Sequence, residues 1–149
     1  MSDPVVPPQR MDTRRAAPAA HAAMAAFDAA VELEPALREL VRVRASLVNG
    51  CAYCIRLHTR DALEAGETQE RLFALGAWEE SPLFTARERA ALRLTDAVTL
   101  VGEGHVPDAA WAEAAGEFEE AELAQLLFAV VAINAWNRLA IATRKRPLP

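Results

Sequence analysis

The chain has 149 residues and a formal net charge of −5, with 52% hydrophobic and 6% aromatic residues. Its basic residues are dispersed apart from the C-terminal tail, which excludes the basic footprint of a nucleic-acid-binding protein. No uncharged apolar run reaches the roughly 18 residues of a membrane span, and the N-terminus lacks the order of a signal peptide. We therefore expect a soluble cytoplasmic protein with neither a nucleic-acid nor a membrane partner.

The N-terminal stretch differs from the rest of the chain. Residues 1–17 are expected to form an extended arm, because Pro4, Pro7 and Pro8 disfavour a helix. An arm of this kind can lie across a neighbouring subunit. Residues 18–149 are expected to form a single domain.

The domain is expected to be all-α, a compact bundle of about six to seven helices. Alanine is frequent, and glycine is scarce outside apparent junctions. Apolar residues recur three and four apart, as with Met24, Phe27 and Val31, which predicts a buried stripe on the first helix. Thr85 and Glu88 form a capping-box pattern that marks a helix start. The expected helices span residues 19–32, 35–48, 51–65, 68–75, 85–101, 107–115 and 119–143.

The last of these helices is apolar on nearly every side at its centre, from Leu123 to Ile133. A helix of this kind must be buried within the domain or against another subunit. Asn134, Trp136 and Asn137 further along it are interpreted as packing or interface residues. The basic run at 144–146 favours the C-terminal end of the helix dipole and is expected to be a solvated tail.

Both cysteines and one of the three histidines fall in one short run, as Cys51, Cys54 and His58. Positions three and four apart share a face of a helix, so the three side chains line up on one stripe. Cysteines three apart on a helix have Cα atoms within reach of an unstrained disulfide. The stripe therefore predicts a redox site that cycles between dithiol and disulfide. The other histidines, His21 and His105, are expected to be exposed or structural.

Two local arguments disagree about which thiol attacks. The helix N-terminus stabilises a thiolate best at Cys51, the expected cap position. His58 lies about 6 Å along the helix from Cys54 but about 10.5 Å from Cys51, so an imidazole base favours Cys54. We favour Cys54 as the nucleophile and Cys51 as the resolving thiol.

The thiol pair has several interpretations. A thiolate that attacks a peroxide becomes a sulfenic acid, which a neighbouring thiol condenses to a disulfide. A protein of thiol–disulfide exchange or redox sensing would use the same pair without peroxide turnover. A structural zinc site is the third alternative, although Cys51, Cys54 and His58 supply only three of the usual four ligands. Two inert buried cysteines are the fourth. We expect no cofactor and no bound metal.

The wider pattern around the cysteines resembles a known family. Glu39 completes the motif E-x11-C-x-x-C-x3-H, and the run Leu37–His58 is similar to the alkylhydroperoxidase D-like branch of the carboxymuconolactone decarboxylase superfamily. The similarity continues through residues 74–78, 84–92 and 133–138. It covers essentially residues 10–143.

The resemblance implies an all-helical antioxidant enzyme of peroxiredoxin type that reduces alkyl hydroperoxides through the thiol pair. By motif match, Cys54 corresponds to the peroxidatic cysteine and Cys51 to the resolving one. Glu39, Cys51 and His58, with a water, correspond to a relay that removes the proton from Cys54. Physically, Glu39 would hold and polarise His58 or that water. The decarboxylase branch lacks the C-x-x-C, so lactone decarboxylation is not expected.

The resemblance also implies partners. A dithiol must reduce the disulfide, and a lipoyl-bearing or thioredoxin-like protein would serve. Members of the family assemble as trimers or hexamers, so a homo-oligomer is expected. Tyr53 stands where the best-known peroxidase of the family has a second histidine, and this departure bears on peroxidase efficiency and on the choice of reductant.

Overall fold

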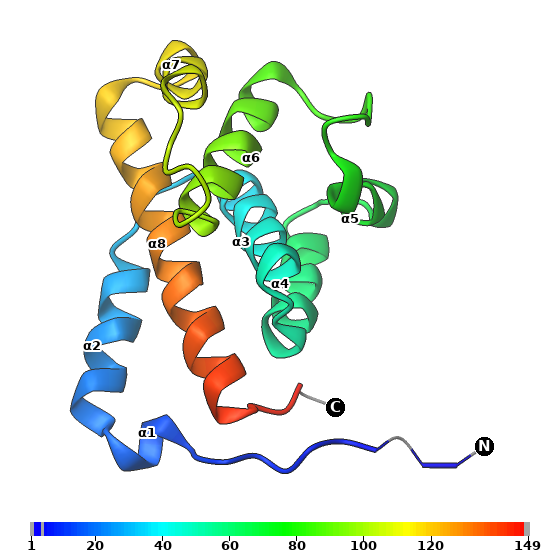
Figure 1. Cartoon of the computed structure of the whole chain (residues 1–149), viewed down its shortest axis with the longest axis vertical. Coiled ribbons are helices and arrows are strands. Elements are labelled where there is room, and N and C mark those ends of the chain that lie inside the picture. The colour runs from blue at the N-terminus through cyan, green and yellow to red at the C-terminus, as the bar shows by residue number, and fades with distance from the viewer. Residues whose placement is uncertain (1, 4, 148–149) are drawn as a thin grey trace.

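The computed structural model describes residues 2–3 and 5–147, and all regular secondary structure in these residues is helical (Figure 1). The expectation of an all-α bundle is confirmed. Eight α-helices and one 3-10 helix follow one another as α1 Thr13–Ala16, α2 Pro18–Ala29, α3 Pro35–Asn49, α4 Ala52–Glu64, α5 Gln69–Ala74, η1 Leu75–Ala77, α6 Ala86–Thr99, α7 Asp108–Glu117 and α8 Glu120–Thr143.

The N-terminal arm runs past the C-terminal end of α8 in the same chain (Figure 1). The backbone N–H of Arg10 donates to the carbonyl of Thr143 at 2.8 Å, and its guanidinium donates to the carbonyl of Ala142 at 3.1 Å. The expectation of extended backbone through residue 17 is wrong at 13–16, because the Asp12 carboxylate caps α1. Residues 1, 4, 148 and 149, which belong to the expected arm and domain, lie outside the described residues. The boundary at residues 17–18 stays a prediction.

Helix α2 packs along α8 at the edge of the bundle (Figure 1). Met24 and Phe27 are only half-buried, so the expected buried stripe is wrong for these two residues within one chain. Val31 is buried, but it follows the helix, which ends at Ala29. The cause is that α2 meets the bundle mainly through α8, where Phe27 contacts Phe128 edge-to-face at 5.9 Å between ring centroids.

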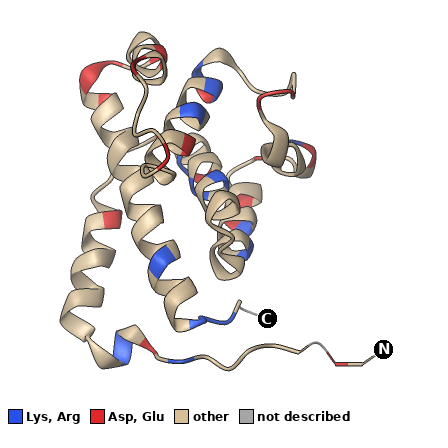
Figure 2. Ribbon diagram, viewed as in Figure 1, with Lys and Arg blue, Asp and Glu red and all other residues tan. Residues whose placement is uncertain are grey.

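Helix α8 is the central element, because it packs against α2, α3, α4, α6 and α7. Leu126, Val130 and Ile133 on one face are at most 1% exposed, whereas Phe128 and Val131 on another are about half exposed. The helix has the length and hydropathy to cross a membrane, and in the described residues it packs against five other helices of the bundle. Figure 2 shows acidic residues at the start of α8 and basic residues just beyond its end, as the helix dipole favours.

A partly buried polar network fixes α3, which carries part of the candidate site. Arg44 on α3 forms a two-pronged ion pair with Asp96 on α6, at 2.7 and 3.0 Å. It also donates to the carbonyl of Leu75 at 2.9 Å. The indole N–H of Trp78 donates to the same Asp96 carboxylate at 3.0 Å. Because every charged partner is hydrogen-bonded, the network holds three segments together at little desolvation cost.

The packing of α8 predicts the effect of a cavity in the core. Replacing fully buried Leu126 by alanine should lower the free energy of unfolding by about 2–5 kcal/mol, because the void cannot collapse completely. Urea denaturation monitored by circular dichroism measures the change. The matched control is Phe73→Ala, a side chain 81% exposed on α5, which should change stability by less than about 0.5 kcal/mol. Equal losses in the two variants would contradict the assignment of the core.

Candidate active site

The two cysteines sit at the N-terminus of α4. Gly50 ends α3 in the left-handed conformation, with φ 69°, and reverses the chain into α4. Cys51 is the N-cap of α4, as the sequence predicted, and its Sγ accepts from the backbone N–H of Cys54 at 3.3 Å. The sulfur atoms lie 2.6 Å apart, and both residues are buried. A disulfide therefore needs little backbone movement.

A second group of side chains lies one turn further along α4. His58 Nδ1 is 3.0 Å from Glu39 Oε2 on α3, and both residues are buried. The other Glu39 oxygen accepts from Arg42 at 2.6 Å, and Arg42 reaches Asp28 on α2 at 2.8 Å. Burial alone would raise the pKa of Glu39, but the hydrogen bond to His58 and the charge of Arg42 together hold that pKa below its usual value.

The two thiols have pKa values displaced in opposite directions. The hydrogen bond from the Cys54 thiol is the largest influence on Cys51 and outweighs burial, so the pKa of Cys51 falls to about 7. The same hydrogen bond, burial and the charge on Cys51 all raise the pKa of Cys54. We therefore expect the thiolate of the pair to form more readily at Cys51. The choice of Cys54 as the attacking thiol stays a prediction.

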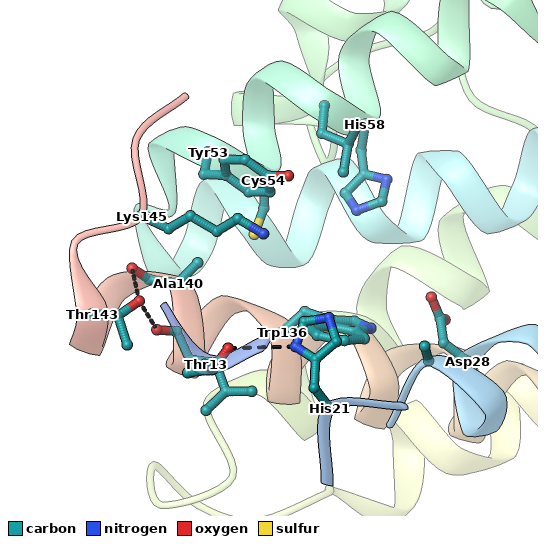
Figure 3. Close-up of a pocket in the computed structure, with 13 residues that line it drawn as sticks. Thr13, His21, Asp28, Tyr53, Cys54, His58, Trp136, Ala140, Thr143 and Lys145 are labelled. Atoms are coloured by element: carbon teal, nitrogen blue, oxygen red, sulfur yellow. Dashed lines mark hydrogen bonds between the residues drawn. The ribbon is translucent and has the colours of Figure 1, made fainter. Parts of the chain in front are cut away.

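A cavity of about 280 Å³ opens beside Cys54 and His58. Figure 3 shows these two residues on one wall, facing His21 and Trp136 on the other. The remaining lining residues are Thr13, Ala25, Asp28, Tyr53, Leu57, Leu139, Ala140, Thr143 and Lys145. Most of this surface is apolar, so the cavity suits a small organic molecule and brings it against Cys54.

Two side chains that line this cavity make contacts that the sequence did not predict. His21 is half-buried rather than exposed, because its ring packs edge-to-face on Trp136 at 5.3 Å and its Nδ1 lies 3.4 Å from the Thr13 hydroxyl. Lys145 is exposed, as expected of a solvated tail, but its Nζ also lies 4.2 Å from the centroid of the Tyr53 ring, and the residue lines the cavity. His105 is exposed, as expected.

Cys51 faces a different opening from Cys54. A groove of about 390 Å³ reaches Cys51 and is lined by the arm at residues 5–7 and by the basic tail at residues 144–146. Neither Cys54 nor His58 lines this groove, and Cys51 does not line the first cavity. Tyr53, Ala140 and Lys145 line both and separate them. The two thiols are thus approached from two sides.

The structure brings the four predicted site residues together in two pairs. Cys51 contacts Cys54, and Glu39 contacts His58. Within residues 2–3 and 5–147, no direct hydrogen bond joins His58 to a thiol, although His58 and Cys54 share the cavity wall. In the same residues, the group close enough to share a metal ion is Glu39, His58 and Asp61, without either cysteine.

Sequence reasoning missed several residues around the pair. Lys145 and Asn137 are 91 and 83 positions beyond Cys54, respectively, and no local pattern connects them with it. Asn134 and Asn137 pack inside the chain, where both accept hydrogen bonds from Asn49 at 2.9 Å. A signal was nonetheless present, because two asparagines on a helix that is otherwise apolar indicate buried polar contacts.

These features define a class of protein: an all-helical bundle in which a C-x-x-C pair caps a helix beside a buried glutamate–histidine pair. The carboxymuconolactone decarboxylase family model matches residues 15–97, more than half of the chain. The chain belongs to the carboxymuconolactone decarboxylase family, within its alkylhydroperoxidase D-like branch.

Three similar proteins illustrate the range of this family and fold. An uncharacterized protein, YdfG, from Bacillus subtilis is 39% identical over 109 residues, which span 73% of this chain and 74% of YdfG. A protein of unknown function from Agrobacterium tumefaciens, described as a putative antioxidant defence protein AhpD, is 33% identical with a TM-score of 0.93, over 95% of this chain and 99% of its own. The debrominase Bmp8 shares the fold at 18% identity with a TM-score of 0.76, over 91% of this chain and 75% of its own.

The pKa difference between the thiols predicts a titration that belongs to Cys51. Alkylation by iodoacetamide should rise with an apparent pKa of about 7 in the wild type, because the thiolate is the reactive form. The transition should persist in Cys54→Ser, whose hydroxyl still donates to Cys51, and should be absent in Cys51→Ser. A low-pKa transition that survives in Cys51→Ser would instead put the first thiolate on Cys54.

Proposed function

We propose that this protein is a thiol-dependent reductase of organic hydroperoxides. The observation that carries the proposal is the position of Cys54, in the wall of a largely apolar cavity and in contact with a second thiol. An organic hydroperoxide that enters this cavity meets one sulfur that can attack it and, behind that sulfur, one that can resolve the product. The similarity to a putative antioxidant defence protein supports the same conclusion.

The first step is peroxide cleavage. The proton of Cys54 passes to the Cys51 thiolate, which lies 2.6 Å away. The Cys54 thiolate attacks the terminal oxygen of the hydroperoxide, the O–O bond breaks, and an alkoxide leaves. His58, held by Glu39, provides the proton that converts the alkoxide to an alcohol. Cys54 is now a sulfenic acid, oxidised by two electrons.

The second step forms the disulfide. The Cys51 sulfur attacks the sulfur of the sulfenic acid, the S–O bond breaks, and the Cys51 proton leaves with the hydroxyl group as water. The two steps together convert one hydroperoxide and two thiols to an alcohol, water and a disulfide. An external dithiol, such as a lipoyl-bearing or thioredoxin-like protein, then reduces the Cys51–Cys54 disulfide. Cys51 lines the second groove, and we place the approach of this dithiol on that side.

The proposed setting is a homo-oligomer, a trimer or hexamer, in the cytoplasm. The exposed apolar residues Phe128 and Val131 on α8 support an interface between subunits, because contiguous exposed apolar surface marks contact sites. A cytoplasmic location fits a cysteine pair used for chemistry rather than as a permanent cross-link.

A second candidate function is thiol–disulfide exchange or redox sensing without peroxide turnover. The pKa of Cys51, at about 7, suits exchange with other thiols, and Cys51 has its own opening to the surface. Tyr53, in the place of a second histidine, removes one acid–base group from the site. This function predicts rapid exchange with a model dithiol and negligible consumption of peroxide.

The two candidates separate in a peroxide assay on the cysteine variants. With an alkyl hydroperoxide and a dithiol reductant, the wild type should turn over and Cys54→Ser should fall to the uncatalysed background. Without the reductant, Cys51→Ser should consume one peroxide per chain and stop with a sulfenic acid on Cys54, detectable by dimedone labelling and mass spectrometry. Equal rates in wild type and Cys54→Ser would refute the peroxidase proposal. A dimedone adduct on Cys51 in Cys54→Ser would reverse the roles of the thiols.

The role of Glu39 predicts a matched pair of variants. Glu39→Gln should lower kcat/KM for the hydroperoxide by about 10²-fold, because a neutral amide no longer stabilises a protonated His58. Glu64→Gln, an exposed position on α4, should leave it unchanged. Because folding lowers the pKa of Glu39, its ionised form also stabilises the folded state. The wild type should therefore gain stability relative to Glu39→Gln above about pH 4.3, and this gain should be lost as pH falls through the folded pKa. Unchanged kinetics in Glu39→Gln would remove Glu39 from the relay.

A further inference from the structure

A buried amide lies beneath the thiol pair. Asn137 on α8 is fully buried, and it is a polar residue on a helix whose core face is otherwise largely apolar. Burying an amide is costly unless its donors and its acceptor are hydrogen-bonded. Each polar atom of Asn137 therefore needs a partner, and those partners decide what the side chain does.

The hydrogen-bond network fixes the orientation of this amide. Asn49 Nδ2 donates to Asn137 Oδ1 at 2.9 Å, so the oxygen of Asn137 faces α3. Asn137 Nδ2 donates to the Ser46 hydroxyl oxygen at 3.1 Å. The Ser46 hydroxyl donates its hydrogen to the carbonyl of Arg42 at 2.7 Å, so Ser46 can only accept from Asn137. If the amide were flipped, its N–H groups would face the N–H groups of Asn49. Its oxygen would face the Ser46 oxygen, which has no hydrogen left to donate.

One N–H of Asn137 remains after these contacts. An amide nitrogen has two hydrogens, and Ser46 takes one. Ile133 and Ala140, about one turn to either side of Asn137 on α8, pack in one cluster with Cys51 and Cys54, so we assign the sulfur atoms as partners of the second N–H. The Asn137 hydrogen bond lowers the pKa of both thiols, which is the effect of a donor that favours the anionic sulfur.

We propose that Asn137 is a thiolate-binding residue, whose second amide N–H hydrogen-bonds the anionic sulfur of the Cys51–Cys54 pair. The locked amide needs no rearrangement when a thiolate forms, because Asn49 and Ser46 already hold it in place. Since the donor reaches both sulfurs, it follows the negative charge when the proton moves from Cys54 to Cys51. The proposal deepens the proposed peroxidase function, but the thiolate contact itself requires no peroxide.

Asn134 provides the matched control, because it is a buried asparagine one turn earlier on α8. It also accepts from Asn49, at 2.9 Å, but its own amide donates to Thr99 and to the carbonyl of Val130. These two contacts use both amide hydrogens of Asn134, so neither is left for a sulfur atom. A purely structural role in the shared network would make the two asparagines equivalent, whereas a thiolate contact belongs to Asn137 alone.

The first test compares thiol titrations of Asn137→Leu and Asn134→Leu. Thiolate absorbance at 240 nm and iodoacetamide alkylation should give an apparent pKa about one unit higher in Asn137→Leu than in the wild type. Alkylation below pH 7 should be about tenfold slower. Asn134→Leu should lose stability in urea yet keep the wild-type titration. A wild-type titration in Asn137→Leu, or equal displacements in both variants, would overturn the proposal.

A second measurement uses the unaltered protein, in case Asn137→Leu does not fold. The side-chain amide signals of Asn137 and Asn134 are followed by ¹⁵N NMR between pH 5 and 9. The Asn137 signal should titrate with the first thiol, and the Asn134 signal should not; an Asn137 signal that ignores the titration would overturn the proposal. Neither readout involves peroxide, so a negative result here leaves the peroxidase proposal standing. A failed peroxide assay likewise leaves the thiolate contact standing.

Discussion

The contact between the Cys51 and Cys54 thiols at the start of α4 is the interaction around which the rest of the site is arranged. It depends on a sharp reversal at Gly50, whose left-handed backbone ends α3 and begins α4 within two residues. Cys51 then caps the helix with its sulfur, accepting the N–H that an ordinary serine cap would take. The negative end of the pair therefore lies at the positive end of a helix. Oxidation and reduction can proceed on a backbone that hardly moves.

Burial makes this arrangement demanding, because each charge removed from water needs a partner. Glu39, His58 and Arg42 meet this requirement through an alternating chain that continues to Asp28 on a different helix. The result is an ionised carboxylate whose position is set by two cationic or hydrogen-bonding neighbours. The amides of α8 satisfy the same requirement on the opposite side of the thiols. Polar side chains from α3, α4 and α8 are thus hydrogen-bonded to one another around the thiol pair.

The two openings place the peroxide and the reductant of the proposed cycle on different sides of the thiol pair. Cys54 meets the apolar cavity, whereas Cys51 meets the groove between the arm and the basic tail. Tyr53 and Lys145 stand between the two, joined by a cation–π contact. A hydroperoxide and a dithiol carrier would therefore use different faces and would not displace one another. The cations at 144–146 would favour a carrier with an acidic surface.

The sequence by itself determined the helical class, most helix limits and the pairing of Cys51 with Cys54, because periodicity, caps and a three-residue spacing act over a few positions. The E-x11-C-x-x-C-x3-H motif also selected Glu39 and His58, whose contact crosses two helices. The short helix α1 was not predicted, because the nearby prolines indicated extended backbone and the capping role of Asp12 was overlooked. Only the tertiary structure decided that His21 and Lys145 line the cavity beside Cys54 and that Asn137 is buried in contact with Asn49 and Ser46. Those outcomes depend on contacts between segments distant in the chain and on burial, which local spacing does not encode.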